Sequence, residues 1–209
     1  MPRVKQQFDA MRSATKEKIT AAGLQLFSHK GLAATSIQEI ASQAGISVGL
    51  MYHYYKSKEE LFTELVETAV SLAAESTQVR FESGQSPSKK IQLFSQEVIG
   101  DIAQSDWMSQ LYLLMIHYTL VVDLPEEAAE IREKGFVPLE NLKRTIIEGQ
   151  LLGEVKSGDP AEMASLYFAA IQGLAISKLT MGDRFVLPNP DLLSSLLLKS
   201  AENEDGLSA

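Results

Sequence analysis

The chain has 209 residues, 45% of them apolar, and a formal net charge of −8 at pH 7. This length allows one large domain, or a small domain joined to a larger one. The absence of cysteine excludes a disulfide framework, a thiolate nucleophile and a cysteine-ligated metal site. Because His29, His53 and His117 lie far apart in the sequence, they give no metal-ligand spacing, and we expect no metal and no cofactor.

Charge is divided unevenly along the chain. The first 58 residues hold eight basic and three acidic residues, whereas the remainder holds 11 basic and 24 acidic residues. A basic head on an acidic body is typical of a protein that places one end on phosphate. The N-terminus has no apolar run of the secretory type, and the densest apolar stretch, residues 111–124, is too short to span a membrane. We therefore expect a cytoplasmic protein without membrane contact.

The first two helices are expected before residue 45. Thr15 is expected to cap a helix whose apolar stripe begins at Ile19 and which ends at Gly31. Ser36 and Glu39 have the spacing of a capping box, which predicts the start of a second helix.

A third helix follows after a sharp turn. Gly45 is expected to make this turn, because glycine adopts a left-handed backbone at least cost, and Ser47 is expected to cap the helix. Ser57 and Glu60 form a further capping box at the start of a long helix that reaches about residue 80. Residues 35–58, TSIQEIASQAGISVGLMYHYYKSK, therefore predict a helix-turn-helix.

Only helices are expected beyond the polar break at residues 82–88, since no period-two strand pattern occurs. Pro87 suits a first helical turn, and Asp159 with Pro160 forms a second helix start. The expected helices cover about 87–104, 106–122, 125–151, 160–181 and 191–201.

Several motifs resemble the tetracycline-repressor (TetR) family of bacterial regulators. They are the helix end LFSHKG, the TSIQEIA start, the A-G-I-S turn and the MYHYYKSKEEL close, with a weaker match in EGQLLGEVKSGDPAEMASLYFAAIQGLAI. The resemblance implies an all-α homodimer with an N-terminal three-helix domain that binds operator DNA. It also implies a larger C-terminal helical domain that dimerises and binds a small effector whose presence releases the DNA. We place the DNA-binding domain at 1–58, a connecting helix and linker at 59–83, and the effector and dimerisation domain at 84–209.

The third helix is expected to lie in the major groove of double-stranded DNA. Met51 and Tyr55 should face the core, against Phe27 and Ile40. The expected base contacts are Ser47, Val48, Leu50 and His53. The expected phosphate contacts are Thr35, Ser36, Gln38, Tyr52, Tyr54, Lys56 and Lys58. The resemblance implies phosphate contacts for Tyr52 and for the position of Tyr54, where the family more often has histidine, whereas the serines are first of all helix caps.

The C-terminal half is rich in aromatic residues and methionine, which suits an adaptable apolar pocket. The expected pocket residues are Trp107, Met108, Tyr112, Met115, His117, Phe136, Tyr167, Phe168 and Gln172. For each of them a plain core or surface position is the alternative. The helix at 160–181 is apolar on nearly every face and must be covered on two sides, which predicts a homodimer interface. Its expected residues are Leu166, Ala170, Leu174, Leu193, Leu196 and Leu197.

Three functions compete at this point. The first is a dimeric regulator, most simply a repressor, that binds a palindromic operator and is released by a small, largely apolar effector. The second keeps the DNA-binding head but gives the body a protein partner in place of a small molecule. The third, a helical enzyme or lipid carrier, finds no catalytic residues in support, because lone carboxylates such as Glu97, Asp101 and Glu148 are ordinary surface charges.

Val48 and Leu50 are apolar side chains expected on a base-reading face, where their natural partner is the thymine methyl group. The variant Leu50→Ala should therefore lose about 1–3 kcal/mol of discrimination at one base pair of each half-site. Binding measured against a set of single-base operator variants tests this. An equal loss on every sequence would contradict the assignment.

Overall fold

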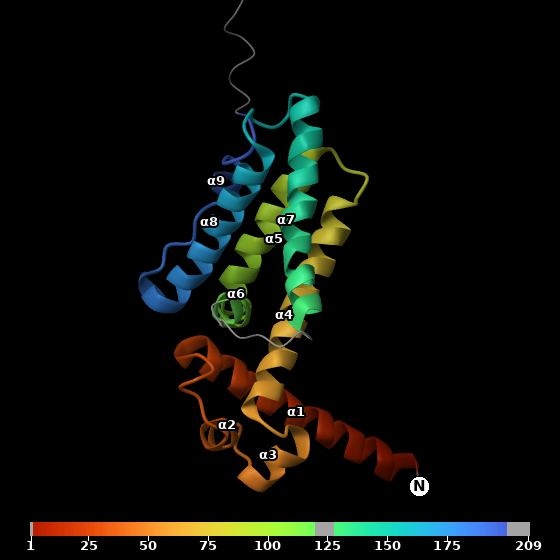
Figure 1. The fold of residues 1–209 in the computed structure, drawn as a ribbon, viewed down its shortest axis with the longest axis vertical. Coiled ribbons are helices and arrows are strands. Elements are labelled where there is room, and N and C mark those ends of the chain that lie inside the picture. The colour runs from red at the N-terminus through yellow and green to blue at the C-terminus, as the bar shows by residue number, and fades with distance from the viewer. Residues whose placement is uncertain (1, 120–127, 200–209) are drawn as a thin grey trace, which may run out of the picture. The chain divides into compact units, whose positions relative to one another are not determined.

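The computed structural model describes residues 2–119 and 128–199. Its elements are α1 (Pro2–Lys30), α2 (Ile37–Gln43), α3 (Val48–Tyr54), α4 (Lys58–Phe81), α5 (Pro87–Gln104), α6 (Asp106–Thr119), α7 (Ala128–Leu151), α8 (Pro160–Met181), the 3₁₀ turn η1 (Gly182–Arg184) and α9 (Pro190–Ser194) (Figure 1). These two ranges form no strand beyond an isolated bridge between Val155 and Leu198. The all-α expectation is confirmed. No helix in the same ranges is long and apolar enough to cross a membrane.

The described residues form two packing units. The first contains the described parts of Met1–Ala69 and Gln110–Leu124, and the second contains those of Val70–Ser109 and Pro125–Ala209. The limits of these units differ from the domain boundaries expected at residues 58 and 84, because α4 and α6 each contribute residues to both units. Sequence periodicity gives the extent of a helix, but it does not tell which of two cores each of its turns joins.

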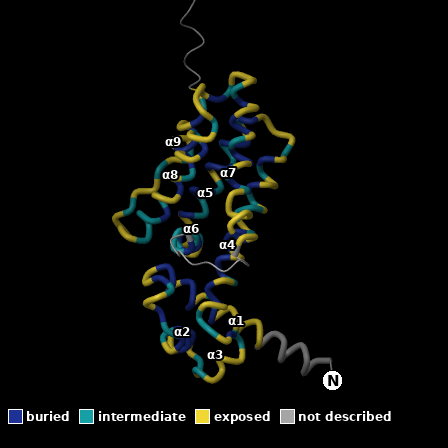
Figure 2. The backbone as a smooth tube through the Cα atoms, in the orientation of Figure 1, coloured by how far each residue is buried: buried dark blue, intermediate teal, exposed yellow. Residues whose placement is uncertain are grey.

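The core of the first unit is built around two aromatic rings. Phe27 and Phe62 meet edge to face with ring centroids 5.2 Å apart, and Tyr118 lies 6.4 Å from Phe62. Ile40 of α2 and Met51 of α3 are fully buried in this unit. Figure 2 shows buried backbone, in dark blue, along α2. Helices of seven residues are not stable alone in water, and so α2 and α3 depend on this burial.

The second unit packs α5, α7 and α8 against one another, and α9 against α5 (Figure 1). Its core holds an aromatic cluster in which the Phe94 ring lies 5.1 Å from Phe81 and 6.2 Å from both Tyr167 and Phe168. The hydroxyls of Ser95 and Tyr167, both fully buried, are hydrogen-bonded at 2.7 Å. This bond satisfies the tyrosine oxygen that burial removes from water.

The expected helix starts are confirmed at most positions and corrected at one. Ser36, Ser47 and Asp159 are N-caps, and Pro87 stands in the first turn of α5. Thr15, however, lies inside α1, which begins at Pro2. The segment before Thr15 has no glycine, and its single proline stands at the helix start, where proline is tolerated.

Two further expectations are corrected by contacts of the backbone. The carboxylate of Glu60 accepts a hydrogen bond from the Lys56 N–H at 2.6 Å, so that only the Ser57 half of the predicted capping box forms. The last helix, expected at about 191–201, ends at Ser194. The chain that follows pairs with the loop after α7, where the Lys156 N–H donates to the Leu197 carbonyl at 2.8 Å. The expected residues 200 and 201 lie outside the described range.

Gly149 of α7 lets this loop approach the helix closely. A Cβ at Gly149 would lie 2.3 Å from Cγ2 of the buried Val155 and 3.1 Å from the Cβ of Pro87. The Gly149 carbonyl also accepts hydrogen bonds from the N–H groups of Glu154 and Val155. The absence of a side chain therefore permits the contact between α7, the loop and the start of α5.

The variant Gly149→Ala should lower the free energy of unfolding by about 1–3 kcal/mol, because the new methyl group overpacks a buried site. Urea unfolding at a fixed protein concentration measures this change. Gly135→Ala is the matched control, since it lies in the same helix with nothing within 4 Å of the new Cβ. Gly135→Ala should raise the free energy of unfolding by up to about 1 kcal/mol, because alanine favours the helix more than glycine does. Equal effects of the two variants would contradict the close-approach argument.

Candidate nucleic-acid interface

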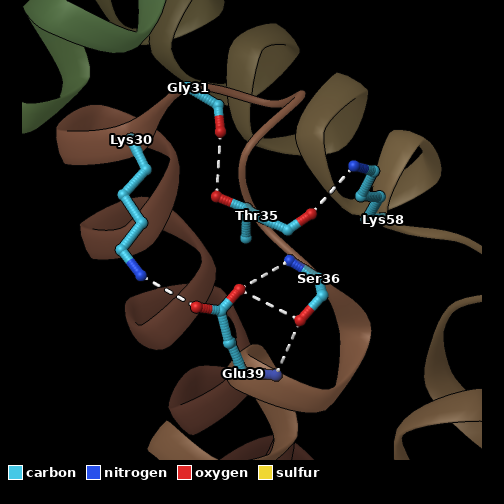
Figure 3. A network of polar contacts seen from close by, with 6 residues as sticks. All are labelled: Lys30, Gly31, Thr35, Ser36, Glu39 and Lys58. Atoms are coloured by element: carbon cyan, nitrogen blue, oxygen red, sulfur yellow. Dashed lines mark hydrogen bonds and ion pairs between the residues drawn. The ribbon is translucent and has the colours of Figure 1, made fainter.

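The N-terminal end of α2 is fixed by a reciprocal capping box (Figure 3). The Glu39 N–H donates to the Ser36 hydroxyl oxygen at 3.2 Å, and the Ser36 N–H donates to the Glu39 carboxylate at 3.0 Å. Two otherwise unpaired N–H groups at the helix start are thereby satisfied. Ser36 is half-buried, so that its hydroxyl is held at the edge of the domain.

The turn between α2 and α3 has the backbone that the sequence predicted. Gly45 adopts φ +68°, in the left-handed region, with nothing near the place of a missing side chain. The Ile46 N–H donates to the Ala41 carbonyl at 3.0 Å, which closes the last turn of α2. The Ser47 hydroxyl accepts from the Leu50 N–H at 3.1 Å and starts α3.

The orientation of α3 is set by the two residues expected to face inward. Met51 is fully buried and Tyr55 is 2% exposed, which confirms that expectation. Tyr55 also donates a hydrogen bond from its hydroxyl to Glu64 at 3.1 Å. The four predicted base contacts lie on the remaining face: Ser47, Leu50 and His53 are exposed and Val48 is half-buried. Tyr52 is exposed as well, with Tyr54 half-buried.

A network of charged and polar groups joins α1 to the start of α2. The Lys30 ammonium lies 2.8 Å from the Glu39 carboxylate, whose other oxygen accepts from Ser36 (Figure 3). The hydrogen bond from Lys30, and then those from the Ser36 backbone and hydroxyl, lower the pKa of Glu39 from 4.5 to about 2. Sequence reasoning recognised the Ser36 and Glu39 pair, but no local spacing pointed to Lys30, nine residues earlier.

Besides Ser36, whose hydroxyl donates to Glu39 at 3.0 Å, two other predicted phosphate contacts have their side chains engaged inside this unit. Thr35 is 2% exposed, and its hydroxyl donates to the Gly31 carbonyl at 2.8 Å. The Lys58 ammonium donates to the carbonyls of Leu32 and Thr35, each at 2.8 Å, and to that of Ala33 at 3.3 Å. Lys58 therefore fixes the α1–α2 loop to the start of α4, and its ammonium is occupied. This placement argues against direct side-chain contacts of Thr35 and Lys58 with phosphate.

The structure brings most of the predicted phosphate contacts together in one hollow of the surface, at the starts of α2 and α4 and beside α3. Its lining includes Thr35, Ser36, Gln38, Tyr52, Lys56 and Lys58. Helix N-termini present free N–H groups and a positive dipole end, which favour an anion. Tyr54, the seventh predicted contact, lines a separate hollow with Arg12, Ser13 and Lys16.

The predicted effector residues are divided between the two packing units. Tyr112, Met115 and His117 belong to the first unit, where a Cβ on Gly31 would lie 3.2 Å from the His117 ring. In the second unit, Tyr167 is a core residue and Phe168 and Met108 are half-buried. Trp107, Phe136 and Gln172 are exposed. Tyr167 and Phe168 are in direct ring contact, with centroids 6.1 Å apart.

The predicted dimer residues differ in accessibility. Leu166 is 61% exposed and Leu196 39% exposed, whereas Ala170 and Leu174 are half-buried. Leu193 and Leu197 are buried within the protomer, which corrects the expectation that they present their side chains outward. The leucines of this segment stand in adjacent groups at 192–193 and 196–198, and this pattern could not distinguish the inner from the outer positions. Leu192 of the same segment, which is not among the predicted interface residues, is 65% exposed.

Metal ligation finds no support among the described residues, where no three histidine or acidic side chains gather in a cluster that would hold an ion. What the first unit offers is a short exposed helix, a hollow lined by helix starts, and basic and hydroxyl side chains around both. This combination can bind a nucleic-acid backbone and present side chains to base edges.

Comparison with known sequences places the similarity in this unit. Residues 19–65 match the family described as bacterial regulatory proteins of the tetR family. The HTH-type regulator YerO of Bacillus subtilis is 47% identical over 58 residues, which is 28% of this chain and 20% of YerO. The chain thus aligns with only about a fifth of that relative's length.

Comparison with solved structures extends the similarity of fold to most of the chain. The MbdR regulator from Azoarcus sp. CIB superposes with a TM-score of 0.75 and 22% identity, covering 87% of this chain and 96% of MbdR. SmeT, the repressor of the Stenotrophomonas maltophilia multidrug efflux pump SmeDEF, is also similar in fold. Its complex with triclosan gives a TM-score of 0.63 and 19% identity over 90% of this chain and 93% of SmeT.

The lowered pKa of Glu39 predicts how stability depends on pH. Because the folded protein holds this carboxylate ionised more strongly than the unfolded chain does, its contribution is complete above pH 4.5 and is lost as pH falls toward about 2. The variant Glu39→Gln should therefore unfold at a lower temperature than the wild type at neutral pH, and the gap should narrow over that acidic range. Thermal unfolding at a series of pH values measures it.

Glu59→Gln is the control for this experiment. Glu59 is exposed at the start of α4 and pairs with no cation among the described residues. The difference in unfolding temperature between Glu59→Gln and the wild type should stay small at every pH. If the Glu39→Gln gap does not change with pH, the Lys30–Glu39–Ser36 network has no part in stability.

Proposed function

We propose that the protein binds operator DNA as a homodimer and represses transcription, a role supported by the match of residues 19–65 to the tetR family of bacterial regulatory proteins. One observation carries the proposal most directly. The α3 helix turns Met51 inward and leaves Ser47, Leu50 and His53 exposed on a face without acidic side chains. A helix of this kind fits the major groove, with its first residues toward the base edges.

The proposed contacts are of two kinds. Ser47, Val48, Leu50 and His53 read bases. Gln38, Tyr52, Tyr54 and Lys56 bind phosphates and fix the register of α3 without reading sequence. Ser36 joins them only where a phosphate replaces its bonds to Glu39. Thr35 and Lys58 support them indirectly, because they hold the loop that carries Ser36.

Dimerisation is proposed through the exposed leucines of α8 and the segment after it. Leu166, Leu192 and Leu196 would be covered by a second copy, with Ala170 and Leu174 between them. Two recognition helices must lie roughly 34–36 Å apart to read the two halves of a palindrome. A homodimer supplies two such helices by symmetry.

The effector is proposed to be a small, largely apolar molecule bound in the second unit near Tyr167 and Phe168. The triclosan complex of SmeT, a protein of similar fold, supports this class of ligand. For the effector to release the DNA, it must bind more tightly to the conformation that does not bind DNA than to the conformation that does.

A protein partner is the second candidate for the body. The exposed side chains of Phe136, Ile147 and Leu151 on α7 favour it, because large apolar groups on a helix surface are typical of interaction sites. The two candidates can be compared on the same sample, because either a small effector or a protein partner can be added to the operator-bound protein and tested for release of the DNA.

The first test is selection of preferred duplexes from a random DNA pool with the purified protein at physiological salt. We expect a palindrome with half-sites about one helical turn apart, roughly 34–36 Å. The selected duplex is then the probe for release by small apolar molecules. Selection of no sequence above background would contradict the proposal.

Lys56→Gln is the matched variant for that probe. As a proposed phosphate contact, Lys56 should contribute equally on every sequence, and its loss should reduce the slope of log K against log salt by about 0.9. A change of sequence preference in Lys56→Gln would show that this side chain reads bases instead.

A further inference from the structure

A second hollow of the first unit lies where α1 passes the end of α3. It is lined by Arg12, Ser13 and Lys16 of α1 and by Tyr54 of α3. Residues 12–16 precede the region that matches the family, which begins at residue 19. The α1 part of this site is therefore a feature of this chain beyond the matched domain.

Lys16 is committed to the structure of the domain. Its ammonium lies 2.8 Å from the Glu64 carboxylate and 5.9 Å from the centre of the Tyr55 ring. The Tyr55 hydroxyl donates to the same carboxylate at 3.1 Å. These contacts tie α1 to the end of α3 and to α4, and they fix the wall of the hollow.

Arg12 stands one helical turn before Lys16 on the same face of α1. It is exposed, and no carboxylate among the residues with described side chains pairs with it. The neighbouring Ser13 hydroxyl donates to Glu17 at 3.1 Å. The hollow therefore combines a guanidinium that pairs with no described carboxylate with a tyrosine at the edge of the proposed DNA-reading helix.

We propose that Arg12 binds a phosphate of the DNA backbone together with Tyr54, outside the hollow at the starts of α2 and α4. The planar guanidinium donates two parallel hydrogen bonds to phosphate oxygens, and the phenol adds a third. The contact extends the footprint along the backbone and reads no base. It rests on the proposed function, because it requires α3 to dock on DNA.

The test compares Arg12→Gln with Lys18→Gln on the selected duplex across a range of salt concentrations. Both variants remove one positive charge from an exposed position of α1. Lys18, six residues on, lies about one and two-thirds turns away and faces another direction. Arg12→Gln should reduce the slope of log K against log salt by about 0.9, whereas Lys18→Gln should leave it close to the wild-type value.

A duplex shortened from its ends, base pair by base pair, locates the contact. The wild type should lose affinity at one length at which Arg12→Gln loses none, because the phosphate that Arg12 binds has been removed. Tyr54→Phe should lower affinity for the long duplex while keeping its sequence preference.

The outcomes separate this inference from the proposed function. If the wild type selects no duplex, the proposed function and this contact both fail. If the wild type binds and the slopes of Arg12→Gln and Lys18→Gln are equal, only the Arg12 contact fails. A third outcome is that the salt slope drops for Arg12→Gln, but wild type and variant lose affinity at the same duplex lengths. Arg12 then acts through the general electrostatic field of the head, and the contact is overturned.

Discussion

The burial of Met51 and Tyr55 decides which side of α3 faces outward, and the proposed interface depends on that choice. A helix of seven residues has little stability of its own. Its orientation is therefore not a local property but a consequence of the core formed by Phe27, Ile40 and Phe62. Tyr52 and His53 are exposed because Met51 and Tyr55, on either side of them, are buried in this core.

The positive charges of the head serve two purposes. Lys16, Lys30 and Lys58 are engaged with carboxylates or carbonyls inside the first unit. Arg12 and Lys56 are exposed without such partners among the described residues. The basic composition of the head is therefore in part a property of its architecture, and the number of lysines overstates the number of side chains ready for phosphate.

Most features predicted correctly from the sequence are local ones. Caps at Ser36, Ser47 and Asp159 and the turn at Gly45 follow from residue type and spacing within one helical turn. Among features that depend on distant segments, the inward orientation of Met51 and Tyr55 was predicted from helical spacing, but others were not. Lys58 bonds to carbonyls up to 26 residues earlier, and Leu197 is buried in a segment whose backbone pairs with the loop at Lys156. The sequence likewise gave no sign that α6, which carries both Trp107 and His117, contributes residues to two units, and the pocket that groups these two residues stays a prediction.

The hydrogen bonds drawn in Figure 3 join residues that all lie between Lys30 and Lys58, within a short length of chain. A substitution elsewhere in the protein removes no donor or acceptor from this set. Apart from the residues of α6 that join the first unit, the C-terminal body can therefore change in sequence without removing any of these hydrogen bonds. A similarity of sequence confined to about a quarter of the chain, beside a similarity of fold over most of it, is the outcome that such unequal tolerance would leave.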